Sequence, residues 1–496
     1  MTSQSTDYTL DLERLDDHLD RVMQIIGDHI RTVRTDPVVA QTNFEKVRAS
    51  FPSELPYQGN DPDQVLDEVV ASFPPVNTRI GHPRFLAWIT TSPSPAGTIG
   101  ELLSVGFNQA PLSFKGGPAA TALENIVLTW FSEIFGYGEG WGGTLVSGGT
   151  VANLMGITVA RQAHVPNVAE KGLQGIEKPI TLYVSDQGHM SISRSAMLLG
   201  IGHDHVRSIP SDENFRMRVD ALREAVEADR KAGFHPFCVV AQAGSVSTGA
   251  IDPLNDLADF CEDQGLWLHV DAAYGGAALL SETHRPKLHG INRADSVCVD
   301  PHKWFFVPLE CGITLFKSSA QQKATFRAKA AYLGQESDWD LKNTNFQLSR
   351  QGRALKLWFS FRTYGLDRLA AIVDRNCAMA QLFLSLAAAS PNWTPAAPAD
   401  LSIACARFVP EGHERWTQEE LDQLHIDLLA ELERSGKGFL TPARIGGKAA
   451  VRLCIANHRT TEDDIRLLFD VMTEIGLRLS ANGPRQAQGT AEGSRT

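Results

Sequence analysis

The residues with the clearest chemical potential follow short apolar runs. The first group is Ser147-Gly148-Gly149-Thr150, which lies between the apolar run 143–146 and a helix-like segment. Glycine lets the backbone approach a ligand closely, and the first turn of a helix has free N–H groups that suit an anion such as phosphate. A tight turn with a hydroxyl cap would use the same residues. The group has neither the lysine of a nucleoside-triphosphate loop nor the G-x-G-x-x-G pattern of a dinucleotide site.

Two other apolar runs end in charged side chains. Asp271 closes one of them, and a carboxylate that leaves a buried strand needs a positive partner to offset its desolvation. A metal, a protonated heterocycle or a structural ion pair would each supply that partner, and a ribose contact or a helix cap is also open. Lys303 follows Asp300 and His302 and precedes the aromatic residues 304–306. Burial beside aromatic rings disfavours an ammonium ion, so we expect a free amine that can react with a carbonyl group.

His189 and Ser245 extend this set. His189 follows the apolar run 180–184, where it could stack on a ring, move protons or serve only the structure. Ser245 belongs to a hydroxyl-rich loop after the run 237–241. A phosphate cradle, a histidine for a ring face, a carboxylate for a pyridinium nitrogen and a reactive lysine together make a pyridoxal-phosphate site. The combination is far more specific than any one part, and it predicts pyridoxal 5'-phosphate as the cofactor.

The segments that must position these residues alternate between apolar runs and helix-like stretches. Continuous apolar runs separated by helices are typical of parallel strands buried on both faces, and ligands bind beyond the carboxyl ends of such strands. The expected strands are 143–146, 180–184, 237–241, 267–270, 296–299 and 311–316, with helices over 119–135, 151–164 and 219–232. A smaller α+β part follows, with helices over 366–389, 417–435 and 461–480 and strands over 402–408 and 449–455.

The N-terminal part has a different pattern. A helical repeat of apolar residues predicts an arm that packs on a partner subunit or on the same chain: Leu12, Leu15, Leu19, Val22 and Ile26. Residues 34–75 are expected to be mostly irregular, with a short helix over 62–72. We therefore predict a helical arm over residues 1–87, a large cofactor-binding α/β domain over 88–375, a small α+β domain over 376–480 and a disordered tail over 481–496.

Composition narrows the class of protein. The 496 residues include 46 Lys+Arg and 58 Asp+Glu, a net charge of −12, and 43% are hydrophobic. This balance excludes a mainly disordered chain and argues against nucleic acid or an anionic membrane as a partner. No apolar stretch predicts a membrane span, and the acidic N-terminus is unlike a signal peptide. The 7 cysteines form no C-x-x-C pair, so we expect reduced thiols, no metal site and a cytoplasmic enzyme.

Short motifs over residues 80–475 carry a family resemblance. They are HPRF at 82–85, SGGT at 147–150, SDQGH at 185–189, HVDAAY at 269–274, PHKW at 301–304, RALKLW at 353–358 and FRTYG at 361–365. With these motifs the sequence resembles the group II pyridoxal-phosphate decarboxylases, and among them the aromatic-L-amino-acid decarboxylases. The resemblance implies an aspartate-aminotransferase-like (type I) fold with a large, mainly parallel sheet domain and a small C-terminal α+β domain. It also implies a homodimer with the active site at the subunit interface.

The resemblance further implies a role for individual residues. Lys303 would bind the cofactor covalently, Asp271 would pair with the pyridine nitrogen, and His189 would stack on the ring. The other cofactor contacts would be Gly149, Thr150, Ser245, Ala273 and His302. Serine at 245 replaces the usual threonine of the family, a conservative change if only the hydroxyl matters. The substrate pocket would include Trp88, Ile89 and Thr91, with Leu112 from the neighbouring subunit, and would suit an aromatic or apolar side chain.

One departure from the family bears on the outcome of the reaction. Family decarboxylases usually have a tyrosine on a mobile loop, which gives back a proton after CO2 has left. Here the segment 335–350 is shorter, and Leu341 takes the position of that tyrosine. The leading hypothesis is decarboxylation of an aromatic L-amino acid to the amine, and the second is an oxidative reaction that gives an aldehyde. A non-catalytic relative is a third hypothesis, against which the intact Lys303 and Asp271 count.

Overall fold

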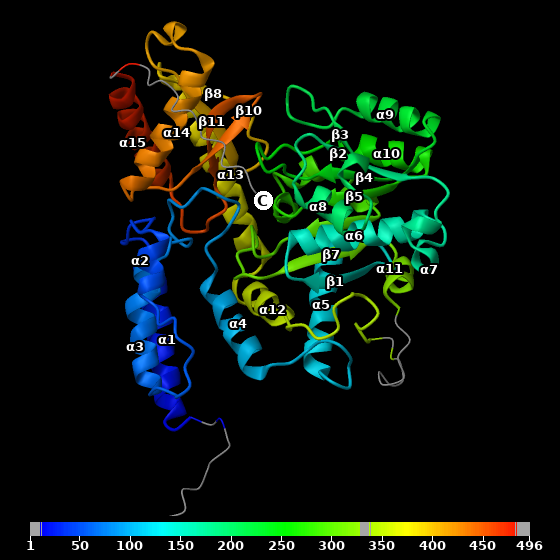
Figure 1. The fold of residues 1–496 in the computed structure, drawn as a ribbon, viewed down its shortest axis with the longest axis horizontal. Helices are drawn as coiled ribbons and strands as arrows, with labels where there is room; N and C mark the ends of the chain where they lie inside the picture. The colour runs from blue at the N-terminus through cyan, green and yellow to red at the C-terminus, as the bar shows by residue number, and fades with distance from the viewer. Residues whose placement is uncertain (1–9, 11, 328–336, 338, 482, 484–496) are drawn as a thin grey trace, which may run out of the picture.

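The computed structural model describes residues 10, 12–327, 337, 339–481 and 483. Its larger part is a seven-stranded sheet with helices on both faces (Figure 1). The strand order is β1-β7-β6-β5-β4-β2-β3. The strands are β1 (Gly142–Val146), β2 (Ile180–Ser185), β3 (Val206–Ile209), β4 (His235–Gln242), β5 (Trp267–Asp271), β6 (Ser296–Val299) and β7 (Gly312–Phe316).

The pairing of the strands confirms most of the predicted sheet. The strands β3, β2, β4, β5 and β6 pair in parallel, as their continuous apolar runs predict. Strand β7 differs, because it is antiparallel to both β6 and β1. The connection from β6 to β7 contains no helix, and parallel strands need a long crossover, so β7 has to return in the opposite direction. Strand β3 was not predicted, because most of its four residues are not buried and the sequence therefore has no continuous apolar run there.

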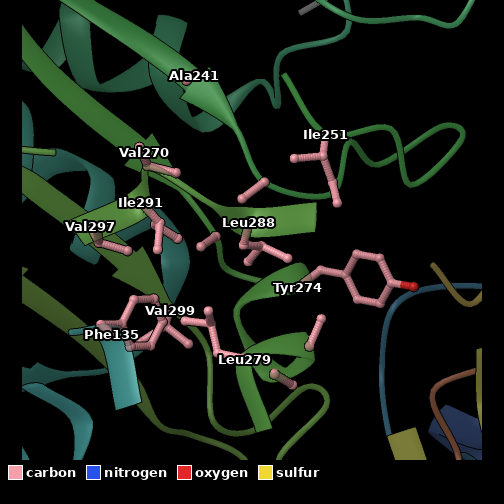
Figure 2. Packing of buried hydrophobic residues seen from close by; sticks show 14 of the residues in the cluster. Phe135, Ala241, Ile251, Val270, Tyr274, Leu279, Leu288, Ile291, Val297 and Val299 are labelled. Carbon is pink, nitrogen blue, oxygen red and sulfur yellow. The ribbon is translucent and has the colours of Figure 1, made fainter. Parts of the chain in front are cut away.

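Two layers of helices cover the sheet. Helices α6 (Gly149–His164) and α8 (Ser191–Leu198) pack on one face. The opposite face is covered by α5 (Pro118–Phe135), α9 (Val219–Lys231) and α10 (Leu254–Gln264). Figure 2 shows part of this second cluster, in which Phe135 lies near Val297 and Val299. Burial of each large apolar side chain contributes about 1.5–3 kcal/mol, so both layers hold the strand ends in place.

The smaller part contains a four-stranded sheet in the order β10-β11-β9-β8, with antiparallel pairing throughout. Its elements are α13 (Leu366–Ala389), β8 (Trp393–Pro395), β9 (Ile403–Phe408), α14 (Gln418–Arg434), β10 (Thr441–Ile445), β11 (Lys448–Cys454) and α15 (Glu462–Ala481). The three predicted helices and two predicted strands are confirmed. Strands β8 and β10 each contain a proline and exposed residues, so they have no strand pattern in the sequence.

Helix α13 joins the two parts. It runs unbroken across residues 375 and 376, where we predicted a domain boundary, and that division stays a prediction. By length and composition alone, α13 is the one helix among the described residues that could cross a membrane, whereas the sequence analysis predicts no membrane span. Its contacts with β8, β9, α15 and the turn 275–280 place it between the two sheets.

The described N-terminal residues form three α-helices, and the predicted arm over residues 1–87 stays a prediction. The helices are α1 (Leu15–Thr32), α2 (Phe44–Ala49) and α3 (Pro62–Ser72), and α1 and α3 lie side by side away from the large sheet (Figure 1). Arg21 of α1 donates to Asp63 Oδ1 of α3 over 2.9 Å. The remaining helices are α4 (Pro95–Phe107), α7 (Val168–Lys171), α11 (Ser319–Phe326) and α12 (Ala354–Tyr364). Nearly all of the predicted tail 481–496 lies outside the described residues.

Candidate active site

Polar residues from several strands meet at the carboxyl edge of the large sheet. They surround a cavity of about 470 Å³, bounded by the segments that follow β1, β2, β4, β5 and β6. Most of the predicted site residues line it: Gly149, Thr150, His189, Asp271, Ala273, His302 and Lys303. This is the edge at which parallel α/β sheets bind ligands. The structure therefore brings together residues that are more than 150 positions apart in the sequence.

Lys303 is paired with a buried carboxylate. Its Nζ lies 3.0 Å from Asp300 Oδ2, and the Asp300 side chain is 2% exposed. Burial opposes the charged amine, but the negative charges of Asp300 and Asp271 outweigh it and raise the pKa of Lys303. The expectation of an amine made neutral by aromatic neighbours is therefore wrong. Trp304 instead stacks on Tyr274 in the core, with ring centroids 4.9 Å apart.

Asp271 is held as an acceptor at the end of β5. Asn153 of α6 donates from Nδ2 to Asp271 Oδ2 over 2.9 Å. The backbone N–H of Ala273 donates to Oδ1 over 3.1 Å. Both carboxylate oxygens of Asp271 therefore act as acceptors. Asp271 can thus present a negative charge to a cationic ring nitrogen.

The start of α6 borders the cavity with two glycines that pack closely against Asp300 and His302. A Cβ on Gly149 would lie 2.6 Å from Asp300 Oδ2, and a Cβ on Gly148 would lie 3.0 Å from His302 Cε1. The helix N-terminus adds N–H groups and a partial positive charge. Two buried lining atoms, Gln242 Nε2 and Asp300 Oδ1, have no hydrogen-bond partner among the described residues. A bound molecule with an anionic group and polar ring atoms fits this part of the cavity, because it would satisfy groups that are costly to leave unpaired.

Two histidines complete the cavity. Burial lowers the pKa of His189 and of His302, so both rings are neutral at neutral pH. His189 Nδ1 lies 2.8 Å from Ser191 Oγ. His302 Nδ1 accepts the backbone N–H of Cys311 over 3.0 Å. Neutral imidazoles in these positions can pack against an aromatic ring without adding charge.

Comparison with known proteins agrees with this site. Residues 45–405 match the pyridoxal-dependent decarboxylase conserved domain. The chain belongs to this decarboxylase family. It is 32% identical over 473 residues to an aromatic-L-amino-acid decarboxylase of Bacillus atrophaeus. The aligned region covers 94% of this chain and 96% of that protein.

Two further relatives extend the comparison. The decarboxylase is 29% identical over 477 residues to a phenylacetaldehyde synthase of Arabidopsis thaliana, with 94% of this chain and 96% of that protein covered. It also resembles the crystal structure of Oryza sativa TDC with PLP and tryptamine. That match has a TM-score of 0.89 and 25% identity, and it covers 96% of this chain and 100% of the other.

The family and the site together establish the type of enzyme. The protein is a carboxy-lyase of the type I α/β fold, and its cofactor is pyridoxal 5'-phosphate. Lys303, Asp271, Gly149 and Thr150 line the cavity and are among the residues that the sequence predicts would hold the cofactor. Their individual roles stay predictions, supported by their common position around the cavity.

The predicted substrate residues lie in different places in the decarboxylase. Ile89 lines the cavity, whereas Trp88, Thr91 and Leu112 are not among its lining residues. Trp88 is 51% exposed and packs edge-on against Phe439, with ring centroids 5.4 Å apart. The Ser245 hydroxyl lies 3.0 Å from Thr248 Oγ1, and Ser245 is likewise absent from the lining. The roles of these four residues outside the lining stay predictions.

Three polar residues of the site carried no assigned role in the sequence analysis. Asn153 bonds to Asp271, Asp300 pairs with Lys303, and Gln242 lines the cavity. Gln242 and Asp300 both stand at or just after strand ends, so the rule that located Asp271 could have found them. Asn153 lies one turn inside α6, and only the packing of α6 on the sheet brings it to β5.

Leu341, at the predicted position of the family tyrosine, is 5% exposed. Its backbone N–H donates to the carbonyl of Leu112 over 3.2 Å, and its own carbonyl accepts from Thr344 N over 3.1 Å. The neighbouring Asp340 accepts the backbone N–H of Phe114 over 2.9 Å. An aliphatic side chain has no ionisable proton, so position 341 cannot supply one to a reacting atom. Residues 335, 336 and 338 of this segment lie outside the described residues.

Proposed function

We propose that this decarboxylase converts an aromatic L-amino acid into the corresponding amine and CO2. The observation that carries the substrate class is the lining of the cavity beyond the cofactor residues. Ile89, Val246 and Leu309 are apolar there, and Glu310 is acidic. No arginine is among the described residues that line the cavity, so an acidic side chain would meet Glu310 without a guanidinium partner. An aromatic ring suits apolar walls.

The chain's own residues prepare the reaction. Pyridoxal phosphate, when bound, supplies a ring that accepts the electron pair left behind as the carboxyl group departs. Asp271, held as an acceptor by Asn153 and by the backbone N–H of Ala273, would present its carboxylate to the pyridine nitrogen of the cofactor. Asp300 holds a proton on Lys303 Nζ, 3.0 Å away, so this amine can deliver a proton within the cavity.

The test is turnover of the reconstituted enzyme with a panel of L-amino acids. The panel includes tryptophan, tyrosine and phenylalanine, with glutamate and cysteine sulfinate as acidic comparisons. We expect aromatic substrates to give CO2 and amine in equal amounts, and acidic substrates to give neither. Turnover of the acidic substrates alone, or of none of the panel, would refute the proposal.

Leu341 supports a second candidate function, oxidative decarboxylation to an aldehyde. In that reaction the amino acid, O2 and H2O give the aldehyde, CO2, NH3 and H2O2. The Arabidopsis relative named a phenylacetaldehyde synthase is nearly as similar to this chain as the Bacillus decarboxylase. Oxygen uptake that matches CO2, with aldehyde in place of amine, would favour this candidate. Under it, Leu341→Tyr should raise the ratio of amine to aldehyde, whereas Leu357→Tyr, at a buried leucine of α12, should not.

We further propose that two copies of the chain form a homodimer in the cytoplasm. Helix α4 exposes five apolar residues that a second copy would cover: Ile99, Leu102, Leu103, Val105 and Phe107. All seven cysteines are free and buried, which suits a reducing compartment. Ile426 is an exposed apolar residue of α14, away from α4, and serves as the control. Analytical ultracentrifugation should give twice the mass of one chain for the wild type and for Ile426→Glu, and a smaller mass for Leu103→Glu. A wild-type monomer with full activity would refute the dimer.

A further inference from the structure

A buried chain of hydrogen bonds runs beneath the cavity from β6 to α6. Trp267 Nε1 donates to Ser296 Oγ over 2.8 Å, and Ser296 Oγ lies 2.7 Å from His269 Nδ1. His269 Nε2 lies 2.9 Å from Asn153 Oδ1. These four side chains are at most 1% exposed. Water therefore does not compete for their hydrogen bonds.

The chain divides at Asn153 and reaches two residues of the active site. Asn153 Nδ2 donates to Asp271 Oδ2 and to Ser191 Oγ, each over 2.9 Å. Ser191 Oγ lies 2.8 Å from His189 Nδ1, and the backbone N–H of Ser191 donates to the same nitrogen over 3.2 Å. Asp271 and His189 are thus linked through side chains that do not line the cavity, apart from Asn153 itself.

The end groups determine the direction of every bond. The indole N–H of Trp267 can only donate, and the carboxylate of Asp271 can only accept. Asn153 must therefore turn its NH2 toward Asp271, which leaves Oδ1 to accept from His269 Nε2–H. Burial lowers the pKa of His269 to about 4, so its ring carries one proton. That proton is on Nε2, and Nδ1 accepts the hydroxyl proton of Ser296.

The same logic applies at His189. Ser191 Oγ accepts from Asn153, so its own O–H donates to His189 Nδ1, where the backbone N–H of Ser191 also points. We propose that Ser191, Asn153, His269 and Ser296 are positioning residues that place the ring proton of His189 on Nε2. Because His189 lines the cavity, Nε2–H is the donor left for a bound molecule. The use of this donor in turnover rests on the proposed decarboxylase function, whereas the placement of the proton does not.

Neutron diffraction from deuterium-exchanged crystals of the holoenzyme tests the proton positions directly. We expect deuterium on Nε2 of both His189 and His269, and the ND2 group of Asn153 facing Asp271. Deuterium on Nδ1 of either ring, or a reversed Asn153 amide, would overturn the proposal. This outcome does not depend on the substrate, so a failure of the proposed function would show separately as a lack of CO2 release in the panel.

Variants of Ser191 test the consequence. Ser191→Ala removes the hydroxyl donor and leaves only the weaker backbone N–H of residue 191, 3.2 Å from His189 Nδ1. We therefore expect kcat for decarboxylation to fall roughly 2- to 12-fold, with deuterium on His189 Nδ1 in a minority of the molecules. Ser191→Thr keeps the hydroxyl and should restore both. Ser195→Ala is the matched control, because Ser195 is equally buried on α8 but donates only to the carbonyl of Ser191 over 2.7 Å. The inference would be overturned if Ser191→Ala and Ser195→Ala lowered kcat equally, or if the position of the His189 ring proton were unchanged in Ser191→Ala. Either result would mean that the Ser191 hydroxyl has only a structural role.

Discussion

Gln242 offers a test in which stability and cofactor affinity should change in opposite directions. Its side chain is 2% exposed, and Nε2 has no hydrogen-bond partner among the described residues. A buried donor without a partner costs about 1–3 kcal/mol. Methionine has nearly the same length and shape but no donor. Gln242→Met should therefore raise the free energy of unfolding of the apoprotein by about 1–3 kcal/mol.

The same substitution should weaken the holoenzyme. If Nε2 donates to a polar atom of bound pyridoxal phosphate, methionine loses a hydrogen bond worth about 0.5–1.5 kcal/mol, which is roughly a 2- to 12-fold increase in Kd. Urea denaturation of the apoprotein gives the first quantity. Fluorescence titration of the apoprotein with pyridoxal phosphate gives the second.

Gln322 provides the matched control. It is equally buried, but its Nε2 donates to the carbonyls of Gly143 over 3.1 Å and Thr344 over 2.7 Å. Gln322→Met should therefore destabilise the apoprotein and leave the affinity for pyridoxal phosphate unchanged. A less stable Gln242→Met apoprotein, or one with unchanged affinity, would refute the assignment of Nε2 to the bound cofactor.

Three further outcomes follow from the site and its surroundings. Lys303→Ala should abolish both turnover and the covalent label that borohydride fixes on the wild-type holoenzyme; near-normal turnover would contradict the role of Lys303. Asp300→Asn removes the closer carboxylate and should lower the pKa of Lys303, so that pyridoxal phosphate labels the amine faster at neutral pH, and an unchanged pH profile of labelling would contradict it. The buried His425 accepts the backbone N–H of Phe408 over 2.9 Å and has a pKa lowered to about 4. A lowered histidine pKa adds stability that is present above pH 6.5 and is lost as pH falls through 4. The free energy of unfolding of the wild type should therefore fall between pH 6.5 and 4, with a contribution from His425 on the order of 3 kcal/mol. Urea unfolding of His425→Gln should lack this contribution.

The sequence located the site where the signal is local. An apolar strand that ends in a carboxylate, as at Asp271, marks a strand end whatever the rest of the fold does. The parallel strands β2, β4, β5 and β6 were found because burial on both faces requires a continuous apolar run. The direction of β7 had no such signal, because an apolar run reads alike in both orientations.

The prediction of a neutral amine at Lys303 is wrong for a related reason. Its aromatic neighbours in sequence suggested an apolar environment, but the turn after β6 directs their side chains into the core. The same turn brings Lys303 N within 2.8 Å of the carbonyl of Asp300, and the two side chains meet at 3.0 Å. Side-chain direction in a turn depends on backbone geometry that residue types alone do not determine.

The hydrogen-bond chain beneath the cavity could not be predicted from the sequence, because it depends on the register between β5 and β6. His269 and Asp271 are two residues apart on β5, so they share one face of the sheet. Ser296 of β6 is the register partner of His269, which places the hydroxyl beside the imidazole. On α6, a Cβ at position 156 would lie 2.4 Å from His269 Cε1, so glycine there is what lets the helix approach. A slip of one residue between β5 and β6 would turn Ser296 to the opposite face and leave His269 Nδ1 without its donor. Register, set by the packing of apolar residues on both faces, therefore determines whether this hydrogen-bond chain can form.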